Sequence, residues 1–448
     1  MDHRFIFLLR AALLPALFAL SAATSGQSAE SPAAPPADSP STLSIEPLSD
    51  TRTLSVMTIA DNVHVALGYG STTMAMIEGE DGVVIIDSLA SETVAAKAME
   101  AFREITGKPV QAVILTHRHQ DHSGGLGAVL GGADIPVYNR PAPRQERNDT
   151  FPHDTGNEPP AAAGEHHPGD ALPAHHLPVS SRQAITIAGL DLELVPAKGD
   201  DNQQLWLWYP AKGVLFSGDG FYTSFPAIHA LGDVSRETRD WLATLDAMLM
   251  QSPRFLVTGH GYPIIGAEQS IAALKDYRDA IALVLEETLA GIDRGLGPDA
   301  LVAAIALPPE LDGLPYLEQR FSRLSWAVRA IYTDRKGWFD GNPTHLDAMP
   351  PATLATRIAE LSGGAEVLFE NGLLALDNGD YRWAAQLADY LMALDPDNPA
   401  ARHMKADALV GLASETATLA ARDFYLQEAR VLRQSAIGQE ATGEDAGD

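Results

Sequence analysis

The fold prediction depends first on the stretch Thr116-His117-Arg118-His119-Gln120-Asp121-His122-Ser123-Gly124-Gly125. It follows residues 110–115, a short apolar run typical of a buried strand. Four side chains that can bind a metal lie within six residues: His117, His119, Asp121 and His122. Burying so many ionisable groups together without a metal would be costly. The stretch therefore predicts a metal site at the end of a strand.

The spacing of these ligands predicts two ions. His117 and His119 are two residues apart, so they can share one side of an extended loop. Asp121 and His122 follow where the loop must turn, which lets them face a second ion. The glycine pair at 124–125 allows another part of the backbone to approach closely.

The motif resembles the H-x-H-x-D-H signature of the metallo-β-lactamase superfamily. The resemblance implies that the first two His bind one metal, that the Asp and the third His bind the other, and that three further ligands come from distant strand ends. Asp219, just after the predicted strand 213–216, fits the bridging carboxylate. His260, just after the predicted strand 255–258, fits the last ligand of the second metal.

The remaining ligand position has no His in this sequence. Most of the superfamily has a His there, whereas this chain has Lys198-Gly199-Asp200-Asp201. A carboxylate can replace an imidazole as an oxygen ligand. Asp200 is our choice and Asp201 is the alternative.

The rest of the first half predicts a layered α/β sandwich. Expected strands cover residues 71–77, 83–87, 184–187, 190–195 and 204–209, and expected helices cover residues 91–106 and 241–250. With the resemblance, this predicts a metallo-β-lactamase αββα sandwich over residues 53–267.

The second half, residues 268–435, is predicted to be helical. Expected helices cover residues 271–289 and 317–332. Residues 365–399 show a helix-turn-helix pattern that resembles one tetratricopeptide unit; an ordinary helical bundle is the equal alternative.

Several segments of this half resemble the linear alkyl sulfatases, which release sulfate from detergents. The segments are 307–311 (LPPEL), 337–343 (GWFDGNP), 379–384 (GDYRWA) and 395–398 (DPDN). The resemblance implies a helical dimerisation domain, and so a homodimer, after the metallo-β-lactamase domain. It also favours Asp200 over Asp201, because Asp200 and Asp219 are nineteen residues apart, as are two Glu ligands of that family.

The chain departs from that family in three places. We expect the family's C-terminal sterol-carrier-like domain to be missing. A sulfate-contacting Asn is replaced by Ala227, and a His that points at the sulfate is replaced by Trp326. Tyr222, His229 and Trp326 are our candidates for substrate-binding residues.

Composition limits the partners and the compartment. The net charge is −28, which disfavours nucleic acid and anionic membrane surfaces. There is no Cys, so the metal ligands must be His and carboxylates. Residues 1–23 read as a signal peptide, 24–52 as a flexible linker and 436–448 as a disordered tail. The expected product is periplasmic or secreted, without stable membrane insertion after processing; an uncleaved anchor helix is the alternative.

These observations predict a binuclear metal-dependent hydrolase. It would use a metal-bound hydroxide and two divalent ions, with zinc the first choice for a His and carboxylate site. Asp121 and Asp219 are the residues we assign to catalysis. The expected small-molecule substrates are alkyl sulfate esters or similar amphiphilic esters. The alternatives are a lactone, β-lactam or carboxylic-ester hydrolase, and a non-catalytic periplasmic binding protein.

Overall fold

The computed structural model describes residues 54–141, 175–228 and 236–444, with side chains described as far as residue 436. Several predictions therefore lie outside the described residues. They concern the signal peptide 1–23, the linker 24–52, the site residue His229 and residues 445–448 of the predicted tail 436–448. The backbone of residues 436–444 in that tail is helical and belongs to α12 (Leu419–Glu444).

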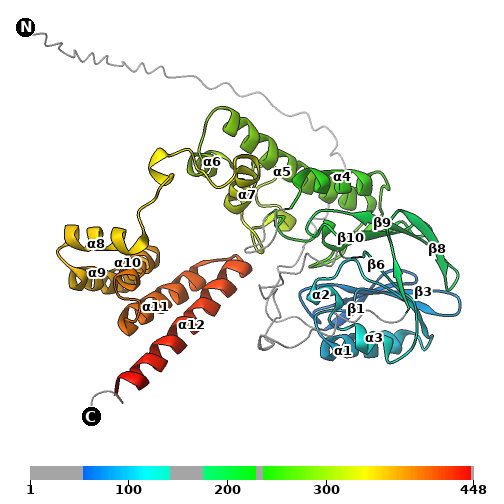
Figure 1. The fold of residues 1–448 in the computed structure, drawn as a ribbon. Coiled ribbons are helices and arrows are strands. Elements are labelled where there is room, and N and C mark those ends of the chain that lie inside the picture. Colours follow the sequence, from blue (N-terminus) through cyan, green and yellow to red (C-terminus); the bar gives the residue numbers. More distant parts are fainter. Residues whose placement is uncertain (1–53, 142–174, 229–235, 445–448) are drawn as a thin grey trace, which may run out of the picture. The chain divides into compact units, whose positions relative to one another are not determined.

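Two β-sheets form the first half of the structure (Figure 1). The seven strands of the first sheet are, in order, β1 (Ser55–Ala60), β2 (Val63–Leu67), β3 (Met74–Glu78), β4 (Val83–Ile86), β5 (Val110–Ile114), β6 (Val137–Asn139) and β7 (His176–Pro178). The six strands of the second sheet are, in order, β13 (Ile264–Ile265), β12 (Phe255–Val257), β11 (Val214–Phe216), β10 (Gln204–Tyr209), β9 (Leu190–Ala197) and β8 (Gln183–Ile187).

Side-chain alternation along the strands explains why both faces of each sheet are covered. In β3, Ala75 and Ile77 enter the core between the sheets, while Met74 and Met76 enter a core on the other face. In β10, residues 205, 207 and 209 face the core between the sheets, and the two Trp at 206 and 208 face the opposite side. Strands that are apolar on both faces require a layer of helices outside each sheet.

Helices supply those outer layers. The outer core of the first sheet contains residues of α1 (Glu92–Ile105) and α3 (Leu126–Leu130). The outer core of the second sheet contains residues of α4 (Thr238–Leu249), α5 (Ala267–Asp293) and α7 (Leu324–Lys336). The architecture is the αββα sandwich predicted from the sequence.

The chain then continues as helices. After α5 come α6 (Pro298–Ala304), α7, α8 (Pro351–Ser362), α9 (Ala365–Asp377), α10 (Tyr381–Leu394), α11 (Pro399–Glu415) and α12 (Leu419–Glu444). The predicted helix-turn-helix corresponds to α9 and α10. Gly379 at the turn has a φ of 75°, and the Asp380 side chain accepts a hydrogen bond from the Trp383 amide at the start of α10. Among the described residues, no helix combines the length and the apolar composition needed to cross a bilayer.

One predicted helix is shorter than expected. The helix expected over residues 317–332 begins at Leu324, because the preceding backbone is bonded elsewhere. The Glu318 carbonyl accepts hydrogen bonds from the Phe225 amide (2.8 Å) and the Ser224 hydroxyl (3.0 Å). The Gln319 carbonyl accepts one from the Thr418 hydroxyl at 2.9 Å.

Candidate metal centre

The predicted ligands come from segments that follow strands of both sheets. His117 and His119 lie on the loop after β5, and Asp121 and His122 lie on the short helix α2 (Gln120–Ser123). The other ligands come from the second sheet: Asp219 in the turn η2 (Gly218–Gly220) after β11, His260 after β12, and Asp200 between β9 and β10.

Direct bonds between the sheets hold these segments together. The Leu205 amide donates to the Thr116 carbonyl at 2.7 Å, beside the first ligand. The Thr73 amide donates to the Gly259 carbonyl at 2.9 Å, beside the last ligand. Residues that are distant in sequence are thereby fixed at one end of the sandwich.

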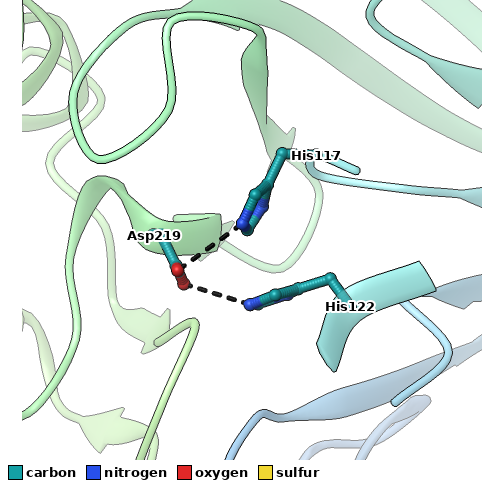
Figure 2. Close-up of side chains that lie close together, drawn as sticks. All are labelled: His117, His122 and Asp219. Atoms are coloured by element: carbon teal, nitrogen blue, oxygen red, sulfur yellow. Dashed lines mark ion pairs between the residues drawn. The ribbon is translucent and has the colours of Figure 1, made fainter. Parts of the chain in front are cut away.

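Asp219 lies at the centre of the cluster, and its carboxylate faces three imidazoles. Its Oδ2 lies 3.5 Å from Nε2 of His117 and 3.3 Å from Nε2 of His260, and its Oδ1 lies 3.3 Å from Nε2 of His122. Figure 2 shows the His117 and His122 rings converging on the two oxygens of Asp219. The second carboxylate, Asp121, has Oδ2 at 3.5 Å from Nε2 of His260.

The cluster contains three groups of side chains whose ligand atoms lie within 4.8 Å of one another. The groups are His117, His122 and Asp219; Asp121, His122 and His260; and His119, Asp200 and Asp219. All seven predicted ligands are therefore close together. Asp201, the alternative to Asp200, lies beside the cluster, with Oδ2 at 3.8 Å from Nε2 of His119.

The chemistry of these side chains fits divalent cations. His122 Nε2 and Asp219 Oδ1 are buried and face each other at 3.3 Å, but neither makes a hydrogen bond among the described residues. Buried polar atoms without a partner are rare, and a coordinated ion would satisfy both of these. The set of imidazole nitrogens and carboxylate oxygens suits zinc and also admits other first-row metals.

Burial and mutual charge shift the pKa values of the cluster. Burial lowers the pKa of His117 to about 3, and nearby His122 acts in the same direction, so this imidazole is neutral as a ligand must be. Burial would lower the pKa of His122, but Asp219, Asp121 and Asp87 hold it well above its usual range. Burial would raise the pKa of Asp219, but the three imidazoles hold it well below its usual range.

Asp87, which the sequence analysis did not select, orients two of the ligands. Its Oδ2 accepts hydrogen bonds from Nδ1 of His122 (2.8 Å) and from the Thr116 hydroxyl (2.9 Å). Its Oδ1 accepts one from the Thr116 amide at 2.7 Å. The Thr116 hydroxyl in turn lies 3.0 Å from Nδ1 of His117. A carboxylate directly after a buried strand was the available signal for this residue.

The predicted close approach at the glycine pair is confirmed. A Cβ on Gly124 would lie 2.1 Å from the Ala90 carbonyl oxygen, and a Cβ on Gly125 would lie 2.1 Å from the Ser88 carbonyl oxygen. The same constraint applies across the cluster, where a Cβ on Gly259 would lie 2.0 Å from Oδ1 of Asp219.

Asp200 is held by two residues from the segment after Asp219. Its Oδ1 accepts hydrogen bonds from the Tyr222 hydroxyl at 3.2 Å and from Nη1 of Arg236. Burial raises the pKa of the Asp200 carboxyl above its usual range, and the Arg236 guanidinium opposes that rise. Arg236 could not be identified from the sequence, because nothing local distinguishes it from a surface arginine at a helix start.

The candidate substrate residues differ in their surroundings. Tyr222 is buried beside His260, with ring centroids 5.8 Å apart. Phe321, which the sequence analysis did not select, lies 5.2 Å from the His260 ring and 5.9 Å from the Tyr222 ring. Trp326 packs against the Arg323 guanidinium, whose carbon lies 5.3 Å from the indole centroid, and its substrate role stays a prediction.

Known protein families and relatives match both halves of the chain. A metallo-β-lactamase superfamily model matches residues 67–260, and an alkyl sulfatase dimerisation model matches residues 297–435. A linear primary-alkylsulfatase from a Pseudomonas strain is 29% identical over 395 residues, covering 82% of this chain and 75% of that protein. An (R)-specific secondary-alkylsulfatase from Pseudomonas is 29% identical over 415 residues, covering 84% of this chain and 62% of that protein.

A solved structure agrees with these matches. The stereoselective inverting sec-alkylsulfatase Pisa1 from Pseudomonas superimposes with a TM-score of 0.73 at 25% identity, covering 85% of this chain and 66% of that chain. This chain thus spans 62% to 75% of the length of these relatives.

The fold and the cluster define a protein of the metallo-β-lactamase superfamily. Within it, the chain belongs to the alkylsulfatase type, in which the metallo-β-lactamase domain is followed by an alkyl sulfatase dimerisation region.

Proposed function

We propose that this protein is a binuclear metal-dependent hydrolase that releases sulfate from alkyl sulfate esters or similar amphiphilic esters. The observation that carries the proposal is the convergence of three imidazoles on the carboxylate of Asp219, with two buried atoms left without hydrogen bonds. The alkylsulfatase names of the relatives support the choice of substrate class.

Each predicted ligand takes a place in this proposal. His117, His119 and Asp200 would hold one cation, and Asp121, His122 and His260 would hold the other. Asp219 would contribute to both, because it belongs to two of the three ligand groups. Zinc is the ion we propose first, since its preferred ligands are imidazole nitrogen and carboxylate oxygen.

Divalent cations at such a site supply Lewis acidity, which activates water for attack at neutral pH and stabilises negative charge on a leaving group. The protein itself provides orientation and desolvation. Asp87 fixes the His122 ring through its Nδ1, and burial lowers the pKa of His117, which favours the neutral imidazole that can bind a metal.

An apolar surface beside the cluster suits the alkyl part of such a substrate. Phe321 and Tyr222 form an aromatic corner against the His260 ring, in which Tyr222 is buried and Phe321 is partly exposed. The sulfate end would face the cations, and the chain would lie along Phe321. A charge of −28 over the whole protein repels anions, so attraction must come from the site itself.

Sulfate release from dodecyl sulfate by the purified full chain tests this proposal. We expect sulfate release that needs added Zn²⁺ after chelation and falls at least about 100-fold in Asp219→Asn, because the central side chain loses its charge and one of its two oxygens. The exposed Asp191 on β9 provides a matched control, Asp191→Asn, that should keep full activity. Fully metal-loaded protein that releases no sulfate would refute the substrate class.

A second candidate is a lactone, β-lactam or carboxylic-ester hydrolase built on the same metal centre. The observation in its favour is that Ala227 and Trp326 stand where the alkylsulfatase resemblance places sulfate contacts. A lactone and ester panel assayed beside dodecyl sulfate separates the two. Turnover of the panel without sulfate release would favour this candidate.

Export and dimerisation belong to the same proposal. The match to an alkyl sulfatase dimerisation model supports a homodimer. The short apolar run ending at Ala23 supports a cleaved signal peptide and a periplasmic or secreted product. Light scattering of the purified protein tests the first point, and sequencing its N-terminus after expression with export tests the second.

A further inference from the structure

The short carboxylate of Asp200 sits in a closed ring of hydrogen bonds. Nη1 of Arg236 and the Tyr222 hydroxyl both donate to its Oδ1. The Ala227 amide donates to the Tyr222 oxygen at 2.6 Å, and the Ala227 carbonyl accepts a second bond from Nη1 of Arg236. Each member of the ring therefore contacts two others.

The ring is buried, which makes its geometry specific. The side chains of Arg236 and Asp200 are 4% and 7% exposed, and Tyr222 is 3% exposed. A guanidinium cannot lose its proton in a protein, so burying it is costly unless an ionised partner is held beside it. Arg236 and Asp200 thus need each other in the folded state, quite apart from any ligand.

The ring uses only one oxygen of Asp200. Both hydrogen bonds fall on Oδ1, and no bond to Oδ2 is present among the described residues. Asp200 is also the carboxylate that joins His119 and Asp219 in the third ligand group. A carboxylate anchored through one oxygen has its other oxygen held at a fixed place and angle.

We propose that Arg236 and Tyr222 are positioning residues that anchor Oδ1 of Asp200, so that its remaining oxygen completes one of the two cation sites with His119 and Asp219. This inference rests on the proposed function, because it assumes that the cluster binds two cations. It explains how an Asp can bind the cation at a position where the alkylsulfatase resemblance has a longer Glu. The hydrogen-bonded ring holds the shorter Asp200 side chain in the position that a ligand needs.

The test measures the two cation affinities separately. Full-length wild type and Arg236→Met are loaded with Zn²⁺ alone and titrated with a competing chelator, and the bound ions per chain are counted. In Arg236→Met we expect one ion to bind about 10- to 100-fold more weakly, as is typical when a residue supporting a ligand is removed. The other ion should keep its wild-type affinity. Arg236→Lys, which keeps a charged donor, should recover part of the loss.

A control variant and a milder variant keep the test decisive. Arg278→Met removes an arginine paired with Asp246 on the surface (2.9 Å) and should leave both ions unchanged. If Arg236→Met does not fold, Tyr222→Phe decides, because it removes only the hydroxyl that donates to Asp200. Tyr222→Phe should lower the affinity for the same ion as Arg236→Met.

Three results are distinguishable. If a folded Arg236→Met binds both ions with wild-type affinity, the inference is overturned and the proposed function still stands. The same holds for Tyr222→Phe if Arg236→Met does not fold. The folded fraction of Arg236→Met is measured by circular dichroism. If both ions are lost in proportion to the loss of folded protein, Arg236 has a purely structural role, and this result would also overturn the inference. A wild-type protein that binds no cation would instead refute the proposed function.

Discussion

Oδ2 of Asp87 lies 2.8 Å from Nδ1 of His122, so the opposite nitrogen of that ring faces the carboxylate of Asp219. Asp87 has a φ of 56°, an uncommon conformation for a residue other than glycine, directly after the buried strand β4. A strained turn at a strand end therefore orients a ligand without contributing one.

Removing Asp87 should weaken metal binding. In Asp87→Ala the His122 ring loses its partner, and we expect the affinity for at least one ion to fall about 10- to 100-fold. Isothermal titration with Zn²⁺ after chelation measures the change. Asp81 lies before the same strand, is exposed and accepts a hydrogen bond from Nε2 of Gln111, so Asp81→Ala should bind Zn²⁺ like the wild type. Equal Zn²⁺ affinities in the two variants would show that Asp87 does not support the metal ligands.

The close approach at Gly259 predicts a steric effect on the central carboxylate. A methyl group there would lie 2.0 Å from Oδ1 of Asp219 and 2.6 Å from the Gly218 carbonyl oxygen, so one of them must move. We expect Gly259→Ala to lose most bound metal and activity. Gly107→Ala meets nothing within 4 Å and should behave as wild type in elemental analysis. Full metal content in Gly259→Ala would contradict the position given to Asp219.

Removing the cations should destabilise the fold, because the cluster is buried and its carboxylates would face one another without them. One ion present at 1,000 times its dissociation constant adds about 4 kcal/mol to the free energy of unfolding. Differential scanning calorimetry should therefore show a lower Tm after dialysis against a chelator, restored by Zn²⁺. In Asp219→Asn the same treatment should change the Tm much less. Equal shifts in both proteins would mean that the ions act elsewhere.

The aromatic corner predicts a dependence on substrate chain length. In Phe321→Ala the His260 ring loses a neighbour 5.2 Å away, and apolar surface available to an alkyl chain is removed. Losing the contact of even one methylene in a hydrophobic pocket costs about 1–3 kcal/mol. We expect KM for dodecyl sulfate to rise about 10-fold, with a smaller rise for a short alkyl sulfate. A change of equal size for both substrates would show that Phe321 does not contact the chain.

The metal-binding role of the short histidine motif could be predicted from the sequence, because its ligands are close together in the chain and follow a recognisable buried strand. It could also place Asp219 and His260, since each follows a strand and the family resemblance supplies the expected order. The αββα layers followed from runs that are apolar on both faces, such as β4 and β10. The first two strands, β1 and β2, were not predicted, although β2 is buried throughout.

The supporting residues could not be predicted, because their roles depend on distant partners. Asp87 is identified only by its bond to His122, which lies 35 residues away. Arg236 pairs with Asp200 across 36 residues, and Phe321 reaches His260 from the helical half of the chain. Residues 318–323 were expected to be helical, yet their backbone bonds to segments around residues 224 and 418. Apolar spacing alone does not contain that information.

Counting the metal ions in the purified full-length protein tests the central claim most directly. Elemental analysis of wild type loaded with Zn²⁺ and freed of excess ion should give two ions per chain. The same procedure on Asp219→Asn should give fewer, since both sites share that carboxylate. A folded wild-type protein that retains no divalent ion would contradict the account of the cluster and the chemistry proposed for it.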